Sequence, residues 1–416
     1  MLNHYSVPFK YPVIDNNDIG SFEKYLAANH KRVAVVVGAG PGGLLSATAL
    51  QISGKFDVIL VIEKRPCYVR DNAFNLRPQA FPMLRKLGLK EAYEGSAHFI
   101  PQIRFHSRRG EQIKVEEEAF LGDPEDVDYS LSPAKIFTGY GWPHHIIKIN
   151  DFEKLLSSSL QKHSNIFLLH GEVDLINVHA TENKMRSFEF QSANSSIFPN
   201  FKITEPNLVV VAAGAKSHMR DRLVGTVNLP DKPPEFWCTG VVSLNGIGNP
   251  ASLKHLSVLE NQNTKKFAFG FLNFDTNDIA LNSTMQFPKN GSIDAKHIEV
   301  SVQESAYEIL QLESRYLDLK LPDSPEQLKV IQSGKVAITY RRPNEFSFGH
   351  NLVFIGDAAG SGTPVGGYGL TFLASIYMDA LLGLVHSSEN IRGEALLQYG
   401  RRIGAAVDYW HSIDLS

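Results

Sequence analysis

The sequence has little cysteine, little net charge and no long apolar run. Cys67 and Cys238 are the only two cysteines, too few for a disulfide framework or a cysteine metal cluster. This usage fits a reducing compartment, so we expect a cytoplasmic protein. A formal net charge of −3 gives no electrostatic reason to bind nucleic acid. No apolar run reaches the roughly 20 residues that span a bilayer, and charged residues 1–31 do not resemble a signal peptide.

The distribution of apolar residues predicts two kinds of sheet. Continuous apolar runs at 33–37, 58–62, 208–212 and 352–355 are typical of strands buried on both faces of a parallel sheet. Short alternating runs between about 224 and 339 favour a mainly antiparallel sheet. Helical spacing of Phe22, Tyr25 and Leu26 predicts a short docking helix in an N-terminal extension, residues 1–31. We therefore expect one α/β domain assembled from separated segments, with a β-rich domain inserted.

A glycine-rich turn follows the first predicted strand. Residues 38–43 read Gly-Ala-Gly-Pro-Gly-Gly and fit G-x-G-x-x-G before a predicted helix at 44–52. The first glycine allows a tight turn, the second lets backbone approach a pyrophosphate, and the third lets helix and strand pack closely. Glu63 lies about 20 residues after the last glycine, where a carboxylate can accept ribose hydroxyls. The motif predicts a dinucleotide site, without distinguishing FAD from NAD; the alternative is a tight turn with an incidental glutamate.

A second motif follows the last predicted strand. Gly356-Asp357 ends the run at 352–355, and a glycine-dense segment from Gly366 to Leu370 opens a predicted helix. The aspartate can accept a hydrogen bond from a ribityl hydroxyl. Backbone N–H groups at a helix start can reach the edge of a flat ring where negative charge develops. This pairing of motifs points to a flavin.

With these motifs the sequence resembles the group A FAD-dependent monooxygenases of the para-hydroxybenzoate hydroxylase fold. That family combines G-x-G-x-x-G, an arginine after the second strand, a mid-chain Asp-Gly motif and a late Gly-Asp motif followed by P-x-x-G-x-G. The resemblance covers most of residues 32–385 and implies an α/β fold. Residues 32–100, 145–223 and 340–416 would form a Rossmann-like, glutathione-reductase-like FAD domain with a mainly parallel sheet and C-terminal helices. Residues 101–144 and 224–339 would form a mainly antiparallel substrate domain.

The resemblance also implies the residues that bind FAD. The adenosine diphosphate part would lie against the glycine turn and the strand end that follows it: Gly38, Gly40, Pro41, Gly42, Gly43, Glu63 and Lys64. Arg70, Asn72 and His145 would reach the cofactor, and Asp357 would bind its ribityl chain. Pro364 and Tyr368 would lie near the flavin, and Gly366, Gly367, Gly369, Leu370 and Thr371 would contact its ring. No metal ligand or separate catalytic residue is expected, because the flavin does the chemistry.

The implied reaction is a hydroxylation. NADPH or NADH would reduce the flavin, molecular oxygen would form a flavin C4a-hydroperoxide, and one oxygen atom would pass to an aromatic or polyketide-like small molecule. Three departures separate this chain from the family: Ala213 replaces an aspartate, Gly360 a histidine and Thr371 an asparagine. Ala213 and Gly360 keep open an FAD-dependent reductase or dehydrogenase without oxygen insertion, and Ala213 also keeps open a flavin-binding partner that has lost catalysis.

Basic residues of the predicted hairpin at 103–115 are expected to be surface charges: Arg104, Arg108 and Arg109.

Overall fold

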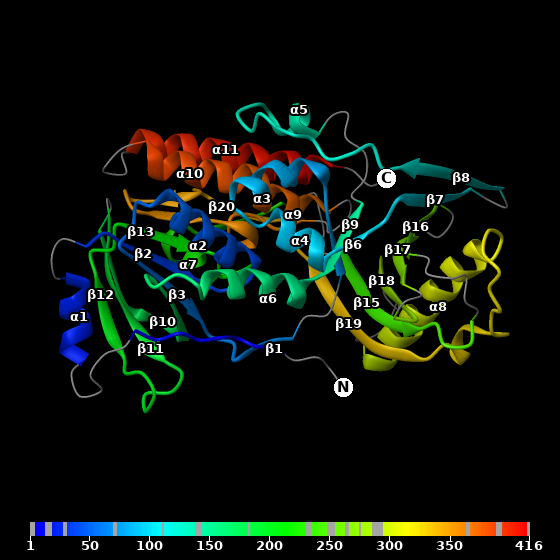
Figure 1. Cartoon of the computed structure of the whole chain (residues 1–416), viewed down its shortest axis with the longest axis horizontal. Helices are drawn as coiled ribbons and strands as arrows, with labels where there is room; N and C mark the ends of the chain where they lie inside the picture. The colour runs from blue at the N-terminus through cyan, green and yellow to red at the C-terminus, as the bar shows by residue number, and fades with distance from the viewer. Residues whose placement is uncertain are drawn as a thin grey trace.

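The computed structural model describes residues 5–12, 19–27, 31–69, 73–109, 112–137, 144–181, 184–229, 235–247, 254–262, 266–273, 276–284, 294–362, 367–387 and 393–413. Two large sheets lie toward opposite ends of the long axis (Figure 1). A three-stranded sheet lies between them, formed by β5 (Ala73–Leu76), β9 (His145–Lys148) and β6 (His98–Phe99). The α/β fold with two different sheets matches the predicted fold class.

The eight-stranded sheet brings together early, middle and late parts of the chain. Its order is β12-β11-β10-β3-β2-β13-β22-β21, and the pairs from β10 to β22 are parallel. The strands of β2, β3, β13 and β22 are fully or almost fully buried, as their unbroken apolar sequences predict. The bounds are β2 Val33–Val37, β3 Val58–Glu63, β10 Ile166–Thr181, β11 Lys184–Ser192, β12 Phe201–Thr204, β13 Leu208–Val211, β21 Ser347–Phe348 and β22 Leu352–Phe354.

Helices cover this sheet and connect its strands. α2 (Pro41–Ser53) packs against α6 (Ile149–Leu160) and α10 (Met378–His386). α6 buries Phe152, Leu156 and Leu160. The other helical segments of this half are η2 Pro78–Ala80, α3 Phe81–Lys86, α4 Lys90–Ser96, α5 Pro133–Phe137, α7 His218–Leu223 and η4 Gly356–Ala358.

The C-terminal helices form two long segments. α9 (Tyr368–Phe372), a π-helical turn (η6, Leu373–Tyr377) and α10 run on as one rod, which α11 (Gly393–Ser412) follows. Helices are predicted at about 370–385 and 392–410, so both are confirmed. The rod Tyr368–His386 is long and apolar enough to cross a membrane. However, 72% of the most apolar stretch of this rod is buried inside the protein. It packs between α2 and α11, as the core helix of a globular domain does.

The seven-stranded sheet is mainly antiparallel, as predicted. Its order is β19-β15-β18-β17-β16-β7-β8, with one parallel pair, β16 and β7. α8 (Ala295–Glu313) packs on one face (Figure 1). The bounds are β7 Gln102–Arg109, β8 Gln112–Ala119, β15 Glu235–Ser243, β16 Lys254–Asn261, β17 Lys266–Asn273, β18 Asp278–Thr284 and β19 Val330–Ile338. A short pair, β14 (Thr226–Asn228) with β20 (Arg341–Pro343), and η3 (Pro325–Gln327) complete this half.

A buried polar cluster attaches α8 to this sheet. Glu313 is fully buried and accepts from His106 Nε2 at 2.8 Å, with His255 Nε2 at 3.3 Å and an ion pair to Arg104. Burial alone would raise the pKa of Glu313, but its two histidine partners and the Arg104 charge hold that pKa well below its usual range. Arg104 is only 8% exposed, so the expectation that it is a surface charge is wrong. Its pairing with a glutamate 209 residues away left no local signal in the sequence.

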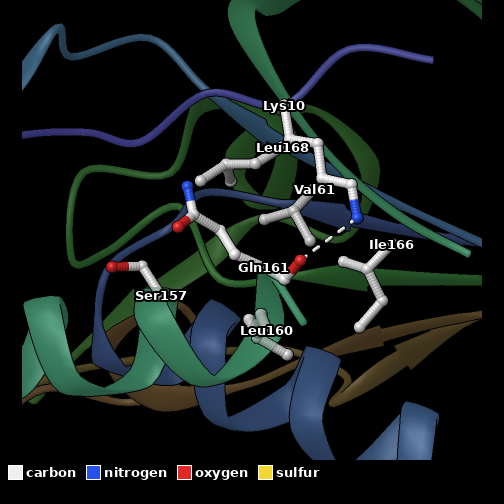
Figure 2. A pocket seen from close by; sticks show the side chains of 7 residues that line it. All are labelled: Lys10, Val61, Ser157, Leu160, Gln161, Ile166 and Leu168. Atoms are coloured by element: carbon white, nitrogen blue, oxygen red, sulfur yellow. Dashed lines mark hydrogen bonds between the residues drawn. The ribbon is translucent and has the colours of Figure 1, made fainter. Parts of the chain in front are cut away.

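The N-terminal extension docks on the eight-stranded sheet. β1 (Tyr5–Ser6) pairs with β4 (Cys67–Tyr68), and α1 (Ile19–Ala27) buries Phe22 to 2% exposure. The Lys10 ammonium donates to the carbonyl of Gln161 at 3.3 Å beside a small pocket (Figure 2). Lys10, Val61, Ser157, Leu160, Gln161, Ile166 and Leu168 line this pocket. None of these is a predicted cofactor residue, so the pocket plays no part in the site below.

Candidate flavin site

Steric contacts explain the glycine-rich turn between β2 and α2. Gly38 has φ +101°, and a Cβ there would lie 2.6 Å from the Ala212 carbonyl oxygen. A Cβ on Gly43 would lie 1.7 Å from the Gly38 carbonyl oxygen. Gly40 precedes α2, and Pro41 occupies the first turn, which leaves the N–H groups of the helix N-terminus available to an anion. The turn therefore has the geometry of a pyrophosphate cradle.

The Gly-Asp turn lies directly against this cradle. Gly356 follows β22 with φ +59°, and a Cβ placed on it would lie 3.9 Å from the Gly42 Cα. β13 lies between β2 and β22, so both turns leave the same edge of the parallel sheet. Ligands of open α/β sheets bind at this carboxyl edge. Two motifs far apart in the sequence thus form one site.

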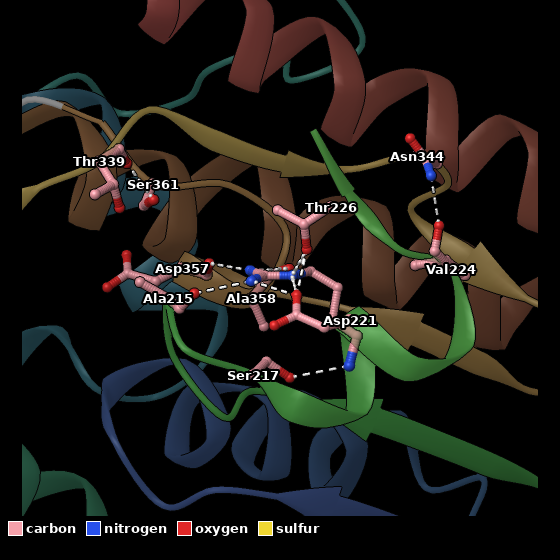
Figure 3. A network of polar contacts seen from close by, with 11 residues as sticks. Ala215, Ser217, Asp221, Val224, Thr226, Thr339, Asn344, Asp357, Ala358 and Ser361 are labelled. Carbon is pink, nitrogen blue, oxygen red and sulfur yellow. Dashed lines mark hydrogen bonds and ion pairs between the residues drawn. The ribbon is translucent and has the colours of Figure 1, made fainter. Parts of the chain in front are cut away.

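A buried arginine fixes the Gly-Asp turn from behind. Arg220 is fully buried, and its guanidinium donates to Ala215 O and Thr226 Oγ1, both at 2.9 Å. It also lies 3.4 Å from the Asp357 carbonyl oxygen and pairs with Asp221 (Figure 3). We expected no role for Arg220; its only sequence signal was its place shortly after a buried strand. It holds the backbone of the mid-chain and late motifs in register.

Glu63 has the position of a ribose-binding carboxylate, but its oxygens already have protein donors. Oε2 accepts from Ala39 N–H at 2.8 Å and from Arg65 Nη2 at 3.0 Å, while Oε1 accepts from Arg65 N and Nε. Burial would raise the pKa of Glu63, but the Arg65 guanidinium and the two backbone N–H groups hold it below its usual range. A carboxylate has about four acceptor positions. The Arg65 side chain, 31% exposed, supplies two of these donors, so a ribose hydroxyl would have to replace it at the carboxylate. Lys64 is exposed beside it.

The start of α9 packs closely against β5. Gly367 has φ +67°, and a Cβ there would lie 2.6 Å from the Asn75 carbonyl oxygen. Thr371 Oγ1 donates to Gly367 O at 2.6 Å and accepts from Arg77 N at 3.0 Å. A Cβ on Gly369 would lie 2.6 Å from the Trp410 ring. The backbone of this helix start therefore has one fixed position. Leu370, partly buried, belongs to the same turn.

A second buried cation faces this segment. The Arg77 guanidinium lies 4.1 Å from the centre of the Tyr368 ring, and Arg77 is only 6% exposed. Burial lowers the pKa of Arg77. A fixed cation near a flavin would favour the negative charge that the ring gains on reduction. Its position directly after a strand was the only indication of Arg77 in the sequence.

His145 lies among aromatic rings. Its imidazole is 4.7 Å from the Phe81 ring and 5.2 Å from that of Phe99, with Phe120 at 5.8 Å between ring centres. Burial lowers the pKa of His145 to about 4, so the ring is neutral at physiological pH. A flavin contact for His145 stays a prediction. Four further predicted residues, Arg70, Asn72, Pro364 and Gly366, lie outside the described residues.

One group of side chains is spaced like metal ligands. Glu94, Asp123 and His145 have ligand atoms within 4.8 Å of one another. Lys90 already pairs with both carboxylates, with its Nζ 3.9 Å from Asp123. The position of a cation is therefore taken by an ammonium.

Two departures from the family have different structural settings. A Cβ on Gly360 would lie 2.7 Å from Val407 Cγ2 on α11, so close helix packing explains why no larger residue stands there. Ala213 is exposed beside the glycine turn, and nothing in its surroundings requires alanine. Gly360 is thus a packing feature, whereas packing does not account for Ala213.

Comparison with known proteins agrees with this geometry. The family model described as FAD binding domain matches residues 31–372. A search of curated proteins finds no match. Among solved structures, CtdE in complex with FAD and a substrate has a TM-score of 0.65 at 13% identity, covering 92% of this chain and 88% of that one. Klebsiella pneumoniae HpxO, complexed with FAD and uric acid, has a TM-score of 0.60 at 16% identity, covering 91% and 86%. The p-nitrophenol 4-monooxygenase PnpA from Pseudomonas putida has a TM-score of 0.59 at 16% identity, covering 92% and 91%.

The fold and the touching turns define a flavoprotein of the oxidoreductase class. The chain belongs to the FAD binding domain family, whose model matches most of its length.

Proposed function

We propose that this protein is an FAD-dependent monooxygenase that uses NADPH or NADH and molecular oxygen to hydroxylate an aromatic or polyketide-like small molecule. The carrying observation is the contact between the two turns, with Gly356 against Gly42. When bound, FAD supplies the redox chemistry and the activation of oxygen. The glycine turn and α2 N-terminus would hold its pyrophosphate, Glu63 its ribose and Asp357 its ribityl chain.

The remaining protein groups would orient and shield the reacting ring. The close packing of Gly367 on β5 fixes the start of α9, against which the flavin ring would lie. Arg77 supplies a fixed positive charge beside Tyr368. The seven-stranded sheet stands opposite, and excluding water from such a site strengthens its electrostatics.

Two measurements test this function. Protein reconstituted with FAD should consume oxygen with NADPH or NADH in the presence of a substrate. Product formed under isotope-labelled molecular oxygen should carry one labelled atom by mass spectrometry. Protein that stays colourless after reconstitution would contradict FAD binding. Turnover with no labelled product would contradict oxygen insertion but not FAD binding.

The exposed Ala213 favours one alternative, an FAD-dependent reductase or dehydrogenase without oxygen insertion. The family aspartate at this position is associated with cofactor and nicotinamide contacts. If its loss limits nicotinamide use, Ala213→Asp should accelerate flavin reduction by NADPH or NADH in anaerobic stopped flow. Ala213→Asn, which adds similar bulk without charge, is the matched control. An unchanged rate in Ala213→Asp would show that this chain does not depend on that contact.

A further inference from the structure

The seven-stranded sheet has two chemically different faces. One packs on α8: the Ser283 hydroxyl is 2.9 Å from that of Ser305, and a Cβ on Gly240 would lie 2.5 Å from Val302. Because side chains alternate along a strand, the neighbours of Ser283 and Gly240 point away from α8. That opposite face, here called the inner face, shares a hydrophobic cluster with Ile146 of β9. β9 pairs with β5, and the start of α9 packs against β5. The inner face is therefore directed toward the flavin site.

The inner face is apolar and aromatic. Trp237 lies 6.1 Å from the Phe267 ring and 6.3 Å from the Phe269 ring, between centres. Phe271 is stacked 5.4 Å from His98 of β6. One row crosses five strands in register: Thr239, Asn282, Phe269, Val258 and Phe105. These five side chains are uncharged, and the row continues on β8 at the exposed Glu116. Flat aromatic ligands pack well on such a surface.

Two polar side chains interrupt this row side by side. Thr239 and Asn282 are direct partners across β15 and β18. Asn282 is 7% exposed and Thr239 is half-buried. In the part of the chain that the structure describes, neither side chain has a hydrogen-bond partner. The polar atoms of both side chains are still reached by solvent, because neither residue is among those whose polar atoms are sealed inside the protein without a partner. A bound molecule that displaces this water can take its place as hydrogen-bond partner.

We propose that Thr239 and Asn282 together bind the single carbonyl or hydroxyl group of a neutral, otherwise apolar aromatic substrate and so orient it toward the flavin. This inference rests on the proposed function. An amide and a hydroxyl can each donate and accept, so the pair suits either substrate group. An ionised carboxylate on these five residues would meet aromatic rings and no cation among them, with the Glu116 carboxylate at the end of the row, which is unfavourable. The substrate is therefore neutral and lacks a carboxylate.

Three probes with a common ring test this selectivity on the FAD-loaded protein: 2-naphthol, 2-acetylnaphthalene and 2-naphthoate. Binding is measured from the change in flavin absorbance. Both neutral probes should bind at least about tenfold more tightly than 2-naphthoate. Thr239→Val and Asn282→Leu should each weaken binding of the neutral probes by roughly 3- to 10-fold, the value of one hydrogen bond. Thr239→Ser, which keeps the hydroxyl, should restore wild-type affinity, and binding of naphthalene should not change in any variant.

Each result decides the inference separately from the proposed function. Preference for 2-naphthoate, binding of none of the probes, or equal affinities in wild type and both variants overturns the substrate class. FAD content and incorporation of labelled oxygen are measured on the same samples. Selective binding together with turnover that yields no labelled product keeps the inference and contradicts the monooxygenase. Oxygen incorporation into a probe without the predicted selectivity supports the monooxygenase and overturns the inference about Thr239 and Asn282.

Discussion

The candidate cofactor site on the eight-stranded sheet is formed by backbone atoms, whereas the candidate substrate site on the seven-stranded sheet is formed by side chains. At the first, Gly38, Gly43 and Gly356 bring main chain close to main chain, with added Cβ atoms falling 1.7 to 3.9 Å from backbone neighbours. At the second, the unpaired polar groups Thr239 and Asn282 come from different strands and meet only through register. The first surface suits a cofactor bound through its phosphates, and the second a substrate bound by side chains. The difference predicts that one surface tolerates almost no added atoms and the other accepts conservative exchanges.

The largest effect is expected at the third glycine of the turn. Gly43→Ala places a Cβ 1.7 Å from the Gly38 carbonyl oxygen, which no rotamer can relieve. FAD binding, measured by quenching of flavin fluorescence, should be lost. Gly42→Ala is the matched control, because the nearest atom to its Cβ is Ala212 Cβ at 3.7 Å, an ordinary contact. Equal loss in both variants would contradict the steric account.

A large effect confined to the other sheet is expected at Glu313. Glu313→Leu removes the buried carboxylate that Arg104, His106 and His255 share, and leaves Arg104 only its exposed partner Glu117. Breaking a buried ion pair costs about 3–5 kcal/mol in comparable cases. Urea denaturation should show this loss, while flavin absorbance at low urea stays unchanged. Glu308→Gln removes a partly exposed partner of Lys266 and should cost at most about 1 kcal/mol. Release of FAD by Glu313→Leu at low urea would show that the two sheets are not independent.

A smaller, pH-dependent effect is expected at His145. Its folded-state pKa of about 4 lies below the ordinary 6.5, so the unfolded chain binds more protons between these values. Stability is therefore complete above about pH 6.5 and falls as the pH drops toward 4, by about 2–3 kcal/mol. His145→Phe should reduce this loss in denaturation curves at pH 7.5 and 4.5. It should also keep FAD affinity if packing is the role of His145, whereas weaker FAD binding would favour the predicted flavin contact.

The smallest effect is expected at Gly360. Gly360→Ala puts a Cβ 2.7 Å from Val407, an overpacking that typically costs about 1–3 kcal/mol. Val407→Ala in the same chain should recover part of this stability, because it removes the clashing methyl groups. Thermal unfolding of the single and double variants measures the coupling. Additive effects would show that the helix moves aside instead.

The sequence could predict the parts of the molecule that depend on local backbone geometry. The turn at 38–43, the Gly-Asp turn and the buried strands each need particular residues at fixed spacing, so the α/β class and the cofactor followed from them. The roles of Arg77 and Arg104 could not be predicted because their side chains contact residues distant in sequence, Tyr368 and Glu313. Arg220 bonds mostly to near neighbours, but its role depends on its contact with the Asp357 carbonyl, 137 residues away. The role of Asn282 could not be predicted for another reason: only the strand register shows which side chains share the inner face.

The last helix has a consequence for how the protein is made. Val407 and Trp410 of α11 lie where Cβ atoms on Gly360, Gly362 and Gly369 would be, and His411 hydrogen-bonds the Ser361 carbonyl. The flavin site therefore needs both the turn at residue 38 and a helix synthesised more than 300 residues later. On the ribosome the nascent chain cannot assemble this site until α11 has emerged. Cofactor loading should thus follow translation, and proteolytic trimming of α11 should release FAD from an otherwise intact chain.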